Sequence, residues 1–219
     1  MALSNSAKVE LKHNRIVTPD LPASFDGFTI LQISDLHVEL SEAAMGRVAG
    51  APLPAPQRAD LRRAHGNHDT ICMVPALEEM GIRMLLNERE RIERGGASIH
   101  LAGIDDAHYY RMDNIEKAAE GIPHREFSIL LSHTPEIYRQ AAHADFNVLL
   151  SGHTHGGQIC LPGGIPITLN CVLPRSMGNG SFNHHGMIGY TSAGAGVSIV
   201  PARFNCPPEV TLHHLHRPS

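Results

Sequence analysis

The chain has 219 residues, of which 42% are apolar and 18% charged, a composition typical of one globular domain spanning 1–219. A net charge of −4 with scattered Lys and Arg argues against nucleic acid as a partner. No apolar run has the length of a signal-peptide core or a membrane span, so the sequence predicts a cytoplasmic protein without a transmembrane segment and leaves its oligomeric state open.

Short apolar runs bounded by turn residues predict strands in the first half of the chain. The run FTILQIS at 28–34 has the pattern of a strand buried on both faces, and Asp35 and His37 follow it directly. Gly95 and Gly96 predict a hairpin turn between two further strands. The elements predicted in this half are strands at 9–17, 28–34, 82–86, 89–93 and 98–104 and a short helix at 75–80.

In the second half, two successive units, FSILLSH and FNVLLSGHTH, each end a buried strand in histidine. A helix with Asp113 as its cap and another opened by Pro135 are predicted around the first of these strands. The chain beyond Gln158 is rich in turn residues and predicts loops before two late strands. The predicted elements are helices at 113–120 and 135–144 and strands at 127–131, 146–150, 186–191 and 210–215.

Residues 43–64 differ from the rest of the chain because they are rich in Ala, Pro and Arg. They show neither the alternation of a strand nor the periodicity of a long helix, and we interpret them as an aberrant or truncated segment.

The stretch SGHTHGGQ at 151–158 is the strongest functional signal. His153 and His155 lie one residue apart in a glycine-flanked turn after a predicted strand, where open α/β folds place their ligand sites. Two neutral imidazoles directed at one point favour a transition metal as the ligand.

Four separated segments supply further metal-capable side chains: DLH at 35–37, GNHD at 66–69, SH at 132–133 and GHTH at 152–155. Their order resembles the calcineurin-like metallophosphoesterase superfamily, whose motifs run D-x-H, G-D-x-x-D, G-N-H-[DE], a lone H and G-H-x-H. The longer form SGHTHGGQ-x-x-LPG, the IDD at 104–106 and the closing PARFNCPPEV resemble its bacterial single-domain branch of phosphodiesterases. The resemblance implies an α/β fold, a four-layer αββα sandwich of two mixed sheets.

The resemblance also implies roles for individual residues. Two divalent ions, Mn, Fe or Zn, would be held, one by Asp35, His37 and His155 and the other by Asn67, His133 and His153. A metal-bound hydroxide would attack a small phosphate ester, with His68 as general acid and Asp69 orienting its ring. A donor set of imidazole, carboxylate and amide oxygen independently favours metals of intermediate hardness.

The family's second motif, G-D-x-x-D, which supplies the carboxylate that bridges both metals, is absent between His37 and Gly66. The interval is also short, so we expect that a central strand–helix segment is missing. One fewer carboxylate facing two divalent ions should weaken the second metal site most, since unit charges about 4 Å apart interact by roughly 4 kcal/mol at an effective dielectric of 20. Glu39 or Glu42 could substitute, although each fits a solvated helix position better.

Other polar clusters fit structural roles better. Asp105 and Asp106 are adjacent, so on a strand they would face opposite sides, and a turn role is favoured. The absence of G-x-S-x-G argues against Ser132 as a nucleophile beside His133.

The four cysteines form no C-x-x-C pair, which favours reduced, buried thiols, although a disulfide stays open. Surface positions in a loop and an edge strand are expected for the histidine tracts 184–185 and 213–216.

Two functions therefore remain. The first is a metal-dependent hydrolase of phosphate esters, a phosphodiesterase whose activity is impaired by the missing motif. The second is a degenerate, non-catalytic relative that binds one metal or none and serves as an interaction module.

Overall fold

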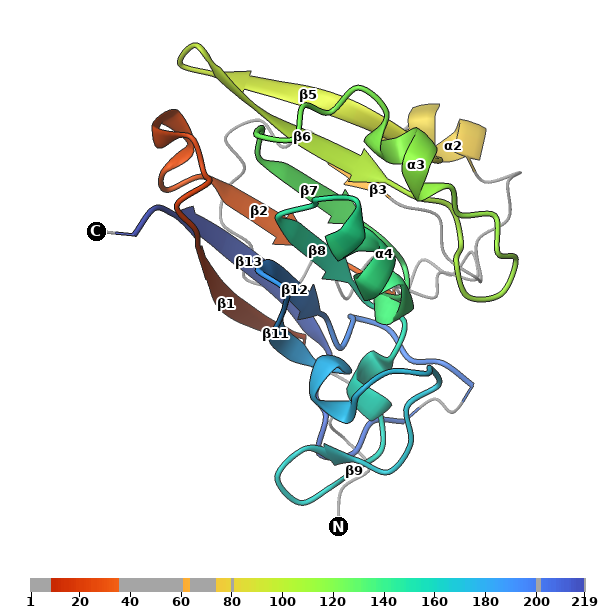
Figure 1. Cartoon of the computed structure of the whole chain (residues 1–219). Coiled ribbons are helices and arrows are strands. Elements are labelled where there is room, and N and C mark those ends of the chain that lie inside the picture. The colour runs from red at the N-terminus through yellow and green to blue at the C-terminus, as the bar shows by residue number, and fades with distance from the viewer. Residues whose placement is uncertain (1–8, 36–60, 64–73, 80, 200–201, 219) are drawn as a thin grey trace.

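The computed structural model describes residues 9–35, 61–63, 74–79, 81–199 and 202–218 (Figure 1). Its largest sheet has six strands in the order β11-β12-β8-β7-β6-β5. The four inner strands are parallel, and the edge strands β11 and β5 are antiparallel to their neighbours. The strands are β5 (Glu88–Arg94), β6 (Ala97–Gly103), β7 (Ser128–Leu131), β8 (Val148–Ser151), β11 (Gly180–His184) and β12 (Met187–Thr191).

A second, three-stranded sheet has the order β1-β13-β2 (Figure 1). β1 (Glu10–Val17) pairs in parallel with β13 (Glu209–His216), and β13 pairs antiparallel with β2 (Thr29–Gln32). Strands near the two ends of the chain are therefore neighbours in one sheet. Two short pairs complete the strands: β3 (Leu61–Arg63) with β4 (Ile82–Met84), and β9 (Cys160–Leu161) with β10 (Ile165–Pro166).

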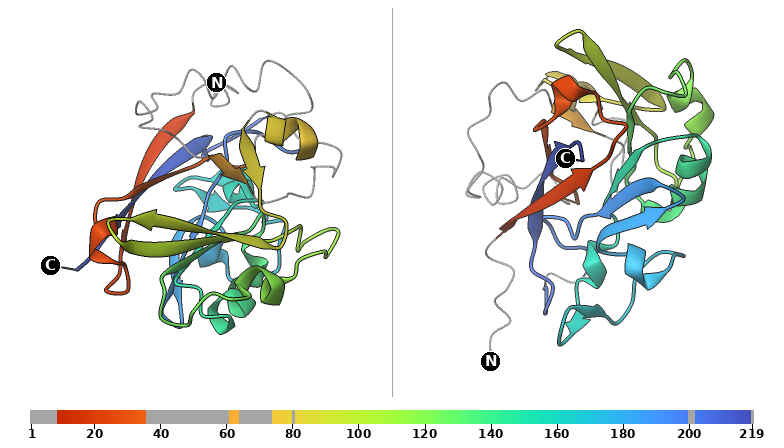
Figure 2. Two further views of the ribbon diagram at one scale, coloured as in Figure 1. Left: turned by 90° about the horizontal axis from the view of Figure 1, so that it is seen from above. Right: turned by 60° about the vertical axis from the view of Figure 1, so that its left-hand side comes forward.

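The two sheets face each other across one hydrophobic core, as the rotated views show (Figure 2). Alternation along the strands divides their residues between two layers, because successive side chains on a strand point to opposite faces. Ile129 of β7 lies in the core between the sheets, whereas Leu130 packs on the outer face of the large sheet. That outer face is covered by α3 (Ile115–Ala119) and α4 (Tyr138–His143).

This architecture confirms the predicted α/β class with two mixed sheets. Most predicted elements are present, including the hairpin turn at Gly95 and Gly96 and the helix α2 (Val74–Glu79). The expected loss of a strand–helix segment concerns the interval between His37 and Gly66, of which the structure describes only residues 61–63.

Three local predictions are wrong. Residues 61–63, inside the segment expected to lack a strand, form β3. The loop expected around 180–184 is β11, an edge strand paired with β12. The cap of α3 is Asn114, whose side chain accepts the backbone N–H of Lys117, and not Asp113.

The histidine tract of β13 also differs from expectation. β13 is the middle strand of its sheet, and His213 is fully buried in the core-facing row. Its two ring nitrogens bond to the side chains of Asn14 (3.0 Å) and Gln32 (2.9 Å). Gln32 in turn donates to the backbone oxygen of Ser151 at 2.8 Å, so a polar chain connects the small sheet to the end of β8. No helix in the described ranges is long and apolar enough to cross a membrane.

Candidate metal centre

Four of the predicted ligands meet at one edge of the two sheets: Asp35, His133, His153 and His155. Asp35 lies three residues beyond β2, and His133 and His153 lie two residues beyond β7 and β8. β7 and β8 are parallel neighbours, so their carboxyl ends deliver both histidines to the same edge. His155 begins the short 3-10 helix η4 (His155–Gly157).

The backbone at these residues is unusual. The φ values are 54° at Asp35, 69° at His153 and 50° at His155. Residues other than glycine rarely adopt this left-handed backbone conformation. Such strain persists only where surrounding contacts enforce it, and it concentrates at functional sites. Close packing is visible at Gly152, where an added Cβ would lie 2.2 Å from Oδ2 of Asp35.

Asp35 is the buried anion of the site, and its side chain is fully shielded from solvent. Both carboxylate oxygens accept the backbone N–H of His153, at 2.9 and 3.1 Å. Nδ1 of His133 and Nε2 of His155 lie 3.9 and 3.8 Å from its Oδ1. Burial raises the pKa of the Asp35 carboxyl, but the charges of His133 and His155 and the local hydrogen bonds together lower this pKa below its ordinary value.

His153 is held through both ring nitrogens. Nε2 lies 2.9 Å from the backbone oxygen of Asn170 and can only donate to it, which leaves Nδ1 to accept from Nε2 of His133 at 3.1 Å. Burial, with the nearby His133 and His108, lowers the pKa of His153 to about 4. The ring is therefore neutral at physiological pH, which is the form that binds metals.

His108 and Glu136 extend the cluster, although sequence reasoning assigned neither of them a role. The centroids of the His108 and His153 rings lie 4.2 Å apart, and Nδ1 of His108 is 2.5 Å from Oε2 of Glu136. Oε1 of Glu136 accepts the backbone N–H of Val172 at 2.7 Å. Glu136 thus ties the loop that carries His108 to the loop that supports His153.

Arg203 is a buried guanidinium behind His155, and it was also missed. It is 2% exposed and donates to the backbone oxygens of Ala193 (2.6 Å), Gly196 (2.7 Å) and His155 (3.2 Å). One of its nitrogens lies 3.2 Å from Nδ1 of His155. The 193–196 loop also bonds to Asp35, because Gly196 N–H donates to the Asp35 backbone oxygen at 2.9 Å. The available signal was a charged residue within the otherwise uncharged stretch PARFNCPP.

The remaining predicted site residues, His37, Asn67, His68 and Asp69, lie outside the described ranges. Among the residues that are described, no three His, Cys, Asp or Glu side chains form a complete metal site. Asp35, His133, His153 and His155 nonetheless have the carboxylate and imidazole donor types that bind metals in proteins. The 3.8 and 3.9 Å separations are too long for hydrogen bonds. Two ligands that each bind one ion at about 2.0–2.2 Å can lie up to about 4 Å apart.

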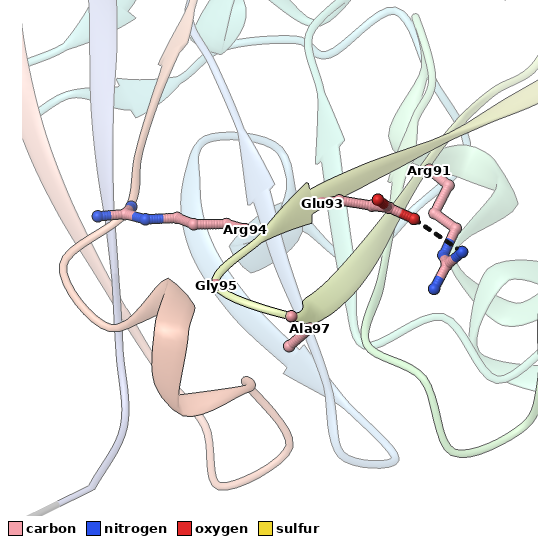
Figure 3. A pocket seen from close by; sticks show the side chains of 6 residues that line it. Arg91, Glu93, Arg94, Gly95 and Ala97 are labelled. Atoms are coloured by element: carbon pink, nitrogen blue, oxygen red, sulfur yellow. Dashed lines mark ion pairs between the residues drawn. The ribbon is translucent and has the colours of Figure 1, made fainter.

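A shallow pocket of about 300 Å³ lies elsewhere, at the turn between β5 and β6 (Figure 3). Arg91 and Glu93 form an ion pair of 2.9 Å at its mouth, while Arg94 points away from them (Figure 3). The pocket shares no residue with the cluster around Asp35, and its exposed, mutually paired charges offer no catalytic group.

Asp106 has the structural role expected of it, because Oδ2 accepts the N–H groups of Tyr109 and Tyr110.

Comparison with curated proteins relates the chain to metallophosphoesterases. The chain is 34% identical over 158 residues to the uncharacterized metallophosphoesterase YkoQ of Bacillus subtilis (strain 168), covering 68% of this chain and 58% of YkoQ. It is 26% identical over 246 residues to the uncharacterized metallophosphoesterase YkuE of the same strain, covering 94% of this chain and 85% of YkuE. It is 27% identical over 158 residues to phosphodiesterase YaeI of Escherichia coli (strain K12), covering 68% of this chain and 56% of YaeI.

The chain thus spans little more than half of YkoQ and YaeI. The YkuE alignment is longer than the chain itself, so YkuE has residues in the aligned region without a counterpart here. No family model matches the chain. No solved structure matches it. Several relatives bear the same family name, and the DLH and GHTH motifs that prompted the resemblance converge through Asp35, His153 and His155. The chain is therefore a member of the calcineurin-like metallophosphoesterase family.

Proposed function

We propose that the chain is a metal-dependent hydrolase of small phosphate esters and that phosphodiesters are its preferred substrates. The observation that carries this proposal is the convergence of two histidines on Asp35. One ring nitrogen each of His133 and His155 lies within 3.9 Å of Oδ1 of Asp35. The names of YkoQ, YkuE and YaeI support phosphoester chemistry in general, and family membership implies divalent metal cofactors.

In this proposal the ligands divide between two ions. Asp35 and His155, with His37, would hold one ion, and His133 and His153, with Asn67, would hold the other. Imidazole ligands beside one buried carboxylate suit Mn, Fe or Zn better than Ca. The ions would polarise the phosphoryl oxygens and activate water near neutral pH.

The chain's own residues would supply position and protons. The backbone N–H of His153 and the glycine-rich 193–196 loop fix Asp35, so the anion is in place before any ligand arrives. His68 would donate a proton to the leaving oxygen, and Asp69 would orient its ring.

The test combines metal analysis with hydrolysis of bis-p-nitrophenyl phosphate in added manganese. We expect Asp35→Asn to lose bound metal and at least 100-fold in rate, because a neutral amide cannot balance the cations. Asp145→Asn is the matched control, since Asp145 shares the positive φ but pairs with His124 at the surface, and it should change neither quantity. Wild-type protein without metal and without turnover above the manganese blank would refute the proposal.

The missing G-D-x-x-D motif favours a second candidate, a relative that binds one ion or none and acts as an interaction module. The YkuE alignment, which is longer than this chain, supports an internal loss. This candidate predicts one metal at most and turnover that His68→Ala does not alter, whereas the hydrolase requires His68-dependent turnover.

A further inference from the structure

Two buried cysteines lie on either side of the turn that carries His155. Cys160 begins β9, and Cys206 lies in the segment that leads into β13; they are 1% and 5% exposed. The two segments are joined by a parallel bridge between Ile159 and Phe204. Cys160 N–H donates to the Phe204 oxygen at 2.9 Å, and the Asn205 side chain donates to the Cys160 oxygen at 3.1 Å. Backbone contacts therefore fix the two cysteines relative to each other.

Both thiols lie close to the same backbone oxygen. Sγ of Cys160 and Sγ of Cys206 lie 3.2 and 3.6 Å from the backbone oxygen of Gly156, so both thiols pack against the same atom. Together with Ala193 they form a small apolar cluster of their own. Both cysteines are free thiols in this structure. A disulfide requires Cα atoms roughly 4.4–6.8 Å apart, and the backbone bonds between the two segments keep the cysteines on adjacent stretches of chain.

We propose that Cys160 and Cys206 are a disulfide-forming site that covalently locks the turn of the metal centre. A hydroperoxide is the oxidant class that fits a buried pair, because it is small. Two S–H bonds break and one S–S bond forms, while two electrons and two protons pass to the peroxide, which is cleaved to water and an alcohol, or to two waters from hydrogen peroxide. A thiol reductant reverses the step.

The surroundings explain how an oxidant reaches the pair and what the bond would do. Leu161, next to Cys160, and Phe204, two residues before Cys206, are more than half exposed, so both segments run along the surface. Burial and the neighbouring Cys206 raise the pKa of Cys160 to about 11, so oxidation should be slow in the closed structure. The bond would close a loop of roughly 45 residues, which constrains the unfolded chain strongly.

The test treats reduced, full-length protein with hydrogen peroxide, then alkylates remaining thiols in denaturant and maps peptides by mass spectrometry. We expect two of the four thiols to become unreactive, a single linked peptide pair containing Cys160 and Cys206, and full reversal by dithiothreitol. Cys171→Ser is the matched control and should form the same link, whereas Cys160→Ser should not.

Thermal unfolding gives a second readout that does not depend on activity or metal. The oxidised protein should unfold roughly 5–15 °C higher than the reduced protein, a shift absent in Cys160→Ser and Cys206→Ser. Four thiols that remain alkylatable after oxidation, or a link that involves Cys72, Cys171 or a second chain, would overturn the proposal.

Discussion

Gly152 is the residue that leaves room for the Asp35 carboxylate. Its φ is not in the left-handed region, so an alanine would fit the backbone, but the new Cβ would lie 2.2 Å from Oδ2 of Asp35 and 2.9 Å from Oγ of Ser34. The Asp35 side chain is fully enclosed and cannot move aside without repacking. The space at Gly152 is therefore required by the position of Asp35 and not by the conformation of the turn.

We expect Gly152→Ala to displace Asp35, lower manganese affinity by at least tenfold and cost about 1–3 kcal/mol of unfolding free energy. Titration calorimetry with manganese and urea unfolding measure the two effects. Gly163→Ala is the control, because Gly163 has a positive φ of 84° but open space around its Cβ position. It should lose about 1 kcal/mol of stability from backbone strain and keep wild-type metal affinity. Equal metal affinity in both variants would contradict the predicted role of Asp35.

Arg203 allows a test of how the turn and the 193–196 loop are held together. Arg203→Lys keeps the charge but loses the planar fork that reaches Ala193, Gly196 and His155 at once. Buried carbonyls left without a donor should reduce the unfolding free energy by about 2–4 kcal/mol in urea. Arg139→Lys, on the exposed face of α4, should change it by less than about 0.5 kcal/mol. A similarly small change in Arg203→Lys would show that this network is dispensable.

At this scale the local pattern predicted which residues would lie close together. Asp35, His133, His153 and His155 each follow a recognisable strand, and the structure brings them together at one sheet edge, while their role as ligands stays a prediction. Arg203, His108 and Glu136 escaped because their partners are distant in sequence: Arg203 bonds to His155, and His108 to Glu136. For His108 and Glu136 nothing in a local window distinguishes them from solvated groups, and the one local signal for Arg203 is its place in an otherwise uncharged stretch.

Among the elements, β13 shows the largest departure from expectation. Its histidines were expected at the surface of an edge strand, but pairing with both β1 and β2 makes it the middle strand. His213 is then buried and must stay neutral, because Asn14 donates to one ring nitrogen and the other donates to Gln32. Burial, with a smaller contribution from His214, lowers the pKa of His213 to about 3.

This burial predicts a pH dependence of stability. Between an unfolded pKa near 6.5 and the folded pKa of about 3, the unfolded chain carries a proton on this ring and the folded chain does not. Acidification therefore favours unfolding, and stability should fall by about 2 kcal/mol from pH 7 to pH 5 through this group alone. His213→Gln, which keeps a donor and an acceptor, should show a shallower decline in urea unfolding across that range. Parallel profiles would refute the prediction.

β11 was missed for a different reason. Its sequence, GSFNH, is bounded by Gly and Asn residues that signal turns, and only pairing reveals it as a strand. Phe182 lies opposite Gly189 of β12, where an added Cβ would be 2.0 Å from the Phe182 ring. The aromatic side chain covers the glycine, so two residues that read as weak strand formers complement each other.

For the molecule as a whole, the sequence predicted the α/β class and two strands at the centre of the large sheet, because the apolar runs FSILL and FNVLL are typical of strands buried on both faces. It did not predict which strands would share the small sheet, since that depends on pairing between residues nearly two hundred positions apart. The missing strand–helix segment between His37 and Gly66 stays a prediction.

The parallel pairing of β1 with β13 bears on the order in which the protein can assemble during synthesis. β13 separates β1 from β2, so neither of the early strands has its sheet neighbour until residues 209–216 have left the ribosome. Segments 10–17 and 29–32 must therefore wait, with their strand edges unpaired and open to aggregation, while the residues between β2 and β13 are translated. During that delay the unpaired edges can pair with other nascent chains.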